Sequence, residues 1–292
     1  MILSISTEFN CMARSGASYL LSFPFLPLSG TIEAMIQALI DELKAQKGLD
    51  ALVLSGSRTG LGGDNLSDWD FYLYAEKSIS LEIRHDLAQR FASHAEVGND
   101  FFGEGDELLL KDGVYADLMY RSLSWAEDEV RRVWIDCHAR VGYTTAFIHN
   151  LKTSKILFDP YHRFSALQER LATPYPEALV QDIIAKNHPL LRSKLTASYY
   201  EQIEHALDRH DLISVAHRTS ALLASYFDVL FAFNRQTHPG EKRLVEWAKH
   251  TCTRLPRDFE EDVAAVVQGI GQEDILERIT VLLDHLDAMM NP

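Results

Sequence analysis

The residues best suited to chemistry are three aspartates and a Gly-Ser pair in the first half of the chain. Asp68 and Asp70 stand two residues apart at the end of the stretch SGSRTGLGGDNLSDWDFYLY (55–74), and Asp117 follows in the run VYADLMY. In an extended strand, residues two apart point to the same side, so the first two carboxylates are expected to share a face. A hard divalent cation with oxygen ligands would relieve their repulsion. The pattern predicts a magnesium site; the alternative is a pair of solvated aspartates at a strand end.

The loop before these aspartates has the composition of an anion-binding turn. Gly56 and Ser57 follow an apolar strand directly, and ten residues separate them from Asp68. Backbone N–H groups and the Ser57 hydroxyl in such a turn can bind phosphate oxygens, and three glycines within residues 60–63 allow a close approach of the backbone. The loop has neither the Gly-Lys-Ser/Thr of a P-loop nor the GxGxxG order of a dinucleotide fold. Arg58 is a further phosphate candidate, with a plain surface residue as the alternative.

Asp117 is an acidic residue in an otherwise apolar run, and a charge in such a place needs a partner. If its strand neighbours the strand of Asp68 and Asp70, three carboxylates converge. Such a group can hold two Mg²⁺ ions against the attacking and leaving oxygens of a phosphoryl group. The alternative is an edge-strand aspartate that faces water.

Gly56-Ser57, the ten-residue gap, Asp68-x-Asp70 and the later Asp117 together resemble the pattern of the DNA polymerase β-type nucleotidyltransferase superfamily, over about residues 50–120. The resemblance implies that the Gly-Ser pair grips a nucleoside triphosphate, with ATP expected, and that the three carboxylates handle two Mg²⁺ ions. In some of these enzymes the residue matching Asp117 takes the proton of the substrate hydroxyl. Asp117 is therefore expected to be a metal ligand, a general base, or both.

The reaction that this resemblance implies is the transfer of a nucleoside monophosphate from an NTP to an acceptor hydroxyl. The helical second half is similar in layout to the small-molecule branch, which includes the antibiotic nucleotidyltransferases that modify aminoglycosides and lincosamides. An AMP-transferring toxin or antitoxin with a protein or tRNA acceptor is one alternative, and a non-catalytic nucleotide-binding module is another. A glycosyltransferase also uses Asp-x-Asp, but its motif normally follows a longer series of strands and helices.

A small mixed β-sheet with helices must position these residues. LDALVLSG is typical of an apolar strand before the loop, and DWDFYLYA alternates as a strand after it. Apolar residues recur at helical spacing over 31–47, with Ser29 or Thr31 as a cap, and a second helix is expected over 79–94. Asp112-Gly113 is a strong hairpin signal between two further strand-like runs. The fold class is therefore α+β, with a nucleotidyltransferase domain expected over 1–172.

The second half of the sequence predicts an all-α helical bundle over 173–292, with Pro174 and Pro176 at the hinge. The helix over 211–235 is apolar on most sides and is expected to be the buried spine of the bundle. The other helices are expected over 175–187, 190–209, 241–252, 257–269 and 272–290.

Four charged residues outside the main motif are weaker candidates. Lys242, with Arg243 beside it, either contacts the triphosphate or lies in a solvated basic turn. Asp228 interrupts the apolar helix, and the favoured interpretation is a buried partner for an Arg or His rather than a substrate contact. Glu104 and Asp106 either border the acceptor pocket or lie in a solvated loop.

Composition narrows the partners and the compartment. The chain has 42 acidic residues against 28 Lys and Arg, a formal charge of −14, which disfavours a long nucleic-acid groove and favours a small cationic acceptor such as an aminoglycoside. The three cysteines (Cys11, Cys137, Cys252) fit neither a disulfide framework nor a zinc site, which favours a cytoplasmic protein. No apolar run is long enough to span a bilayer. The stretch YLLSFPFLPL (19–28) is interpreted as packing on the domain rather than as a signal sequence.

Overall fold

The computed structural model describes residues 30–60, 67–101, 103–194 and 197–291. The expectations for the apolar stretch 19–28, for Cys11, for the helix cap at Ser29 and for the loop glycines within 61–66 lie outside these residues.

The chain packs as two compact units. The first comprises the described residues up to Asp128 together with Thr153–Arg170, and the second comprises Glu129–Lys152 together with the residues from Leu171 onward. The chain therefore passes into the second unit at Glu129, returns to the first at Thr153, and leaves it again after Arg170.

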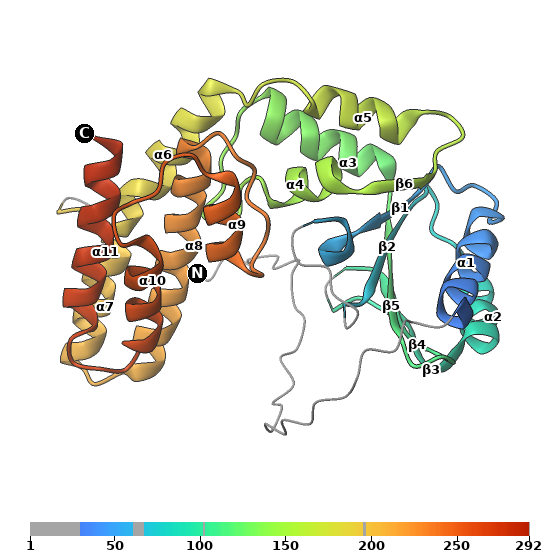
Figure 1. The fold of residues 1–292 in the computed structure, drawn as a ribbon, viewed down its shortest axis with the longest axis horizontal. Helices are drawn as coiled ribbons and strands as arrows, with labels where there is room; N and C mark the ends of the chain where they lie inside the picture. The colour runs from blue at the N-terminus through green and yellow to red at the C-terminus, as the bar shows by residue number, and fades with distance from the viewer. Residues whose placement is uncertain (1–29, 61–66, 102, 195–196, 292) are drawn as a thin grey trace. The chain divides into compact units, whose positions relative to one another are not determined.

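The first unit is built on a six-stranded mixed sheet in the order β3-β4-β5-β2-β1-β6 (Figure 1). Strands β2 and β5 are parallel, and the other neighbouring strands are antiparallel. This sheet and the helical region that follows it confirm the α+β fold class. The strands are β1 (Ala51–Ser55), β2 (Trp69–Tyr74), β3 (Ala92–Asn99), β4 (Gly105–Leu110), β5 (Tyr115–Arg121) and β6 (Lys155–Phe158).

One face of this sheet is covered by α1 (Gly30–Lys44) and α2 (Leu81–Phe91), which lie beside each other in Figure 1. The odd-numbered residues of β2 point into the core on that side: Phe71 and Leu73 are fully buried there, and Trp69 packs against them. The alternation expected from the sequence is therefore confirmed, since it places the even-numbered residues of β2 on the opposite face.

That opposite face is covered in part by α5 (Arg163–Leu171), which follows β6. The buried ring of Phe164 lies 5.2 Å, centroid to centroid, from the ring of Tyr74 on β2. The sheet also carries α3 (Leu123–Val130) directly after β5. Both faces of the central strands thus have apolar cover, which fixes the register that positions the site.

The predicted helix over 79–94 is too long, because α2 ends at Phe91 and Ala92 already begins β3. The segment ASHAEVGN is polar and contains Gly98, so its own residues give a weak strand signal. It becomes a strand by pairing with β4. The hairpin predicted at Asp112-Gly113 is confirmed, with Gly113 at φ +87° between β4 and β5.

The second unit is a helical bundle around α8 (Leu212–Phe233), whose buried residues confirm it as the apolar spine. Its other α-helices are α4 (Ala146–Thr153), α6 (Glu177–Leu191), α7 (Tyr199–Asp208), α9 (Leu244–Thr251), α10 (Phe259–Gln268) and α11 (Ile275–Met290). Helices α6, α7 and α8 pack against one another, and α11 packs against α7 and α10.

Two further expectations concern the cysteines and the length of apolar helices. Within the described ranges, Cys137 and Cys252 carry free thiols. Among the helices that the structure describes, none combines the length and the apolar character that crossing a bilayer would require.

Candidate active site

The strand order brings Asp70 and Asp117 directly opposite each other. Asp70 on β2 pairs in register with Asp117 on the parallel strand β5, and Ser55 at the end of β1 pairs with Asp70 from the other side. Both carboxylates are half-buried and lie on the sheet face opposite α1 and α2, because their neighbours Phe71 and Leu118 face that core. Neighbouring strands are about 4.8 Å apart. Two aspartates from separate parts of the sequence are therefore adjacent at one end of the sheet.

The backbone of Gly56 lies directly beside the carboxylate of Asp70 at this end of the sheet. It follows β1 directly and has φ +70°, a left-handed conformation that glycine adopts readily. A Cβ at Gly56 would lie 1.8 Å from Oδ2 of Asp70, so a side chain at this position would force the Asp70 carboxylate to move. Because Gly56 has no side chain, the Asp70 carboxylate has room to lie there.

The turn after β1 is a 3₁₀ helix over Gly56–Thr59. Its geometry is held by the Thr59 hydroxyl, which donates to the Gly56 carbonyl at 3.0 Å. Before the turn, the Ser55 hydroxyl hydrogen-bonds the Ser154 hydroxyl at 2.6 Å in a buried position next to β6. Ser57 is half-buried within this anchored turn. The sequence signal for this arrangement was the Gly-Ser pair at the end of an apolar strand.

Arg58 connects the start of the loop to its end. Its Nε donates to the backbone carbonyls of Ser67 and Asp68 at 3.0 and 3.1 Å, and its guanidinium lies 4.4 Å from the centre of the Trp69 ring. These contacts make Arg58 a brace for the segment that leads into β2. A contact between Arg58 and a phosphate stays a prediction.

Asp68 lies outside the strand to which the sequence assigned it. Strand β2 begins at Trp69, so strand alternation does not place Asp68 on the face of Asp70. Among the residues that the structure describes, no three His, Cys, Asp or Glu side chains are grouped so that they could hold one metal ion. The pair Asp70 and Asp117 still fits a magnesium ion, because such sites use one or two carboxylates and take their other ligands from substrate phosphates and water.

Glu107 is a site residue that the sequence reasoning missed. It pairs in register with Asp117 across β4 and β5 and is exposed. The row across the sheet thus reads Ser55, Asp70, Asp117 and Glu107. The sequence contained one usable signal, the alternation of DELLL, but the register that aligns Glu107 with Asp117 comes from the hairpin between their strands.

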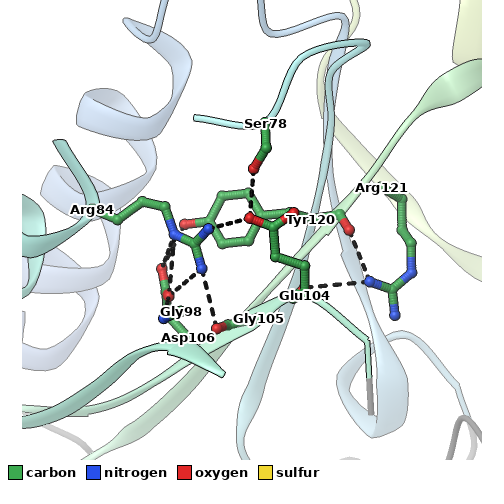
Figure 2. A network of polar contacts seen from close by, with 8 residues as sticks. All are labelled: Ser78, Arg84, Gly98, Glu104, Gly105, Asp106, Tyr120 and Arg121. Atoms are coloured by element: carbon green, nitrogen blue, oxygen red, sulfur yellow. Dashed lines mark hydrogen bonds and ion pairs between the residues drawn. The ribbon is translucent and has the colours of Figure 1, made fainter. Parts of the chain in front are cut away.

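Glu104 is exposed in the loop before β4, as one of its two alternatives predicted, whereas neither alternative holds for Asp106. Asp106 is a buried residue of β4, neither in a solvated loop nor on the face of Asp70, because it pairs with Leu118 on the α2 side of the sheet. There it accepts hydrogen bonds from Arg84 of α2 (Nε to Oδ2, 3.0 Å) and from the Tyr120 hydroxyl (2.7 Å) (Figure 2). Glu104 also binds Arg84 and accepts from Ser78 at 2.7 Å.

This cluster, which we call the Arg84 network, is paired throughout. The Arg84 guanidinium lies 4.0 Å from the centre of the Tyr120 ring, and the backbone N–H of Gly98 donates to Asp106 at 2.8 Å. Burial first, and then the Asp106 carboxylate, raise the pKa of the Tyr120 phenol, so it keeps its proton and donates. The network ties α2 to β3, β4 and β5 and so supports the strand that carries Asp117.

The two candidates in the helical unit have different surroundings. Lys242 is exposed in the turn that precedes α9, and its contact with a triphosphate stays a prediction. Asp228 is fully buried in α8, as favoured, but none of its hydrogen-bond partners among the described residues is an Arg or a His. It accepts from the Thr144 hydroxyl at 2.6 Å and from the Asn187 amide at 3.3 Å. Burial raises the pKa of Asp228 to about 7.

Comparisons with known proteins give the following similarities. Residues 143–248 match a family described as a domain of unknown function (DUF4037). No curated protein matches the chain. Among solved structures, the chain is similar to a nucleotidyltransferase-like protein from Exiguobacterium sibiricum 255-15, with 12% identity over 89% of this chain and 74% of that chain and a TM-score of 0.40.

Two further solved structures are similar over most of their length. One is an aminoglycoside 6-adenyltransferase from Bacillus subtilis, with 11% identity, 88% of each chain covered and a TM-score of 0.30. The other is a CCA-adding enzyme from Thermotoga maritima complexed with tRNA, with 13% identity over 90% of this chain and 80% of that chain and a TM-score of 0.29.

Proposed function

We propose that this protein is a magnesium-dependent nucleotidyltransferase, which moves a nucleoside monophosphate from an NTP to a hydroxyl group of a small-molecule acceptor. The observation that carries the proposal is the register pair Asp70 and Asp117 on adjacent parallel strands, with Gly56 placed against Asp70. Carboxylates on adjacent strands are the oxygen ligands that Mg²⁺ prefers, so this arrangement supports a metal-binding role.

Asp70 and Asp117 would hold the ion, and the phosphates of the NTP would supply further ligands. When bound, Mg²⁺ neutralises charge on the triphosphate and on the pyrophosphate that leaves. Asp68, one residue before β2, is a candidate for a further ligand through water. ATP is the expected donor.

The turn Gly56–Thr59 would hold the triphosphate through backbone N–H groups and the Ser57 hydroxyl. An oxygen of the acceptor attacks the α-phosphorus, the bond from that phosphorus to the β-phosphate oxygen breaks, and pyrophosphate leaves. Asp117 would accept the proton of the acceptor hydroxyl as it attacks. Positioning and electrostatics then supply most of the rate, since the protein forms no covalent bond in this scheme.

The proposed acceptor is a small cationic molecule of the aminoglycoside type. The formal charge of −14 favours such a partner in solution, and exposed Glu107 adds a negative charge beside Asp117. A cationic acceptor would gain from both, whereas a polyanionic acceptor would be repelled.

The test is pyrophosphate release from each of the four NTPs, against a panel of aminoglycosides and neutral alcohols, with Mg²⁺ or with EDTA. We expect Mg²⁺-dependent release that Asp70→Asn and Asp117→Asn abolish, while Asp86→Asn, at an exposed position of α2, keeps wild-type activity. Mg²⁺-dependent NTP binding without turnover on any acceptor would favour the non-catalytic module. Full activity of Asp70→Asn would refute the assignment.

A further inference from the structure

The helical unit contains a pocket of about 380 Å³, and its lining includes none of Gly56, Ser57, Asp70 and Asp117. Its walls are mainly apolar side chains of α8 and α10: Leu223, Ala224, Phe227, Val263 and Val267. This size and this lining are typical of sites for small molecules, which combine apolar walls with a few placed polar groups.

One of those polar groups is Tyr143, which lines the pocket in a strained backbone conformation. Tyr143 has φ +52°, a left-handed value that is uncommon for a residue with a side chain and is strained when that side chain is bulky. Such strain persists only where the surrounding structure holds it in place, and it is concentrated at functional sites.

Two buried acceptors hold the backbone on either side of Tyr143. The N–H of Gly142 donates to the Asn187 side-chain oxygen at 2.8 Å, and the N–H of Thr144 donates to the Asp228 carboxylate at 3.1 Å. Asn187 belongs to α6 and Asp228 to α8, and both side chains are buried. The otherwise unexplained burial of Asp228 therefore has a role, because it fixes the residue that lines the pocket.

The phenol of Tyr143 brings a hydrogen-bond donor to the lining of the pocket. Its ring packs edge-on against His238, with centroids 4.8 Å apart. Burial, followed by the charges of Glu241 and Asp228, raises the pKa of this phenol, so the proton stays on the oxygen. A ligand in the pocket can accept that hydrogen bond.

The charged residues of the lining compensate each other. Arg243 and Glu246 both line the pocket and form an ion pair with an N–O distance of 2.8 Å. A charged ligand would have to compete with a residue that already has its counter-charge. These features disfavour an ionic occupant.

We propose that this pocket binds a small, uncharged and largely apolar molecule that carries one hydrogen-bond acceptor, and that the Tyr143 hydroxyl donates to that acceptor. The ligand's apolar part would contact the side chains of α8 and α10. The proposal is independent of the nucleotidyl transfer proposed above, since the two sites share no residue.

Benzophenone and diphenylmethane form a matched pair of probes, because they have nearly the same shape and only the ketone accepts a hydrogen bond. Binding of each to the full chain is measured by ligand-observed NMR titration. We expect benzophenone to bind tighter by about two- to tenfold, as one net hydrogen bond implies. In Tyr143→Phe this preference should disappear. Equal binding of the two probes to the wild-type protein would overturn the role of Tyr143.

A second pair of variants tests the location. Val267→Trp fills the pocket from its wall, whereas Val281→Trp places the same side chain on α11, at a position that is 44% exposed compared with 50% for Val267. Circular dichroism checks that both fold. We expect Val267→Trp to lose both probes and Val281→Trp to retain them. Wild-type affinity in Val267→Trp, or no binding of either probe to the wild-type chain, would overturn the proposal.

Discussion

The backbone of Gly56 lies so close to the carboxylate of Asp70 that a side chain at position 56 would displace this carboxylate. A Cβ on Gly56 would lie 1.8 Å from Oδ2 and 2.6 Å from Cγ of Asp70. The two residues meet because β1 and β2 are antiparallel neighbours, with Ser55 opposite Asp70 at the point where the chain turns. The loop glycine and the strand aspartate, 14 positions apart in the sequence, therefore act as one structural element.

Gly56→Ala should displace the Asp70 carboxylate and abolish Mg²⁺-dependent NTP binding. The matched control is Gly113→Ala, since Gly113 also has a positive φ (+87°) but a Cβ there would meet nothing within 4 Å. We expect both variants to lose about 1 kcal/mol of unfolding free energy from backbone strain. Only Gly56→Ala should lose NTP binding, measured by calorimetry. Equal NTP affinity in the two variants would count against the role of Gly56.

Arg58→Lys distinguishes a structural brace from a phosphate contact. Lysine keeps the positive charge but loses the planar fork that bonds two carbonyls and lies over Trp69. If Arg58 acts as a brace, Arg58→Lys and Arg58→Met should weaken NTP binding to a similar extent. Retention of wild-type affinity in the lysine variant alone would instead assign Arg58 to the phosphates.

Asp106→Ala should destabilise the first unit strongly. It leaves the buried Arg84 guanidinium with Glu104 as its remaining carboxylate partner and removes the acceptor of the Tyr120 hydroxyl. Loss of one partner of a buried ion pair costs about 3–5 kcal/mol. Urea denaturation measures this loss. The control is Glu42→Ala, which removes an exposed partner of Arg90 and should change stability little. Similar small losses in both variants would contradict the structural role of the network.

Asp228 should make the helical unit less stable as the pH rises from about 4 to about 7. Its pKa is raised by burial from 3.8 to about 7, so over this range the unfolded chain releases a proton that the folded chain keeps. The contribution of Asp228 to the free energy of unfolding is therefore greatest below pH 4 and is lost as the pH approaches 7. The change is on the order of a few kcal/mol.

The buried imidazoles of His149 and His238 act in the opposite sense, because burial lowers their pKa values to about 4 and about 3. The contribution of these two histidines to the free energy of unfolding is present above pH 6.5 and falls as the pH is lowered. The measurement is therefore the free energy of unfolding of the wild-type protein and of Asp228→Asn, obtained by urea denaturation at pH 4.5 and at pH 7.5. We expect the wild-type protein to lose more stability over this interval than the variant. Parallel changes would show that Asp228 does not titrate as stated.

Local patterns were sufficient to predict most elements. The helical spacing around residues 31–47 and 211–235 gave α1 and α8, and the alternation of DWDFYLYA gave β2 with its buried face. These predictions succeeded because an amphipathic pattern depends on one element at a time.

Features that depend on distant partners could not be read from the sequence. Strand β3 forms only through its pairing with β4, and Asp106 is buried because Arg84, 22 residues earlier, reaches it from α2. Asp228 meets Thr144 across 84 positions. The convergence of Asp68, Asp70 and Asp117 was expected on the condition that their strands are neighbours. The sheet order meets that condition and places Asp70 opposite Asp117, but among the described residues no three such side chains are grouped to hold one metal ion.

The most direct test of the proposed metal site is Mn²⁺ binding in the presence of a non-hydrolysable ATP analogue, measured by electron paramagnetic resonance on the full chain. Wild-type protein and Asp86→Asn should bind the ion with equal affinity, and Asp70→Asn and Asp117→Asn should each bind it at least about tenfold more weakly. Wild-type affinity in both Asp70→Asn and Asp117→Asn would contradict the account.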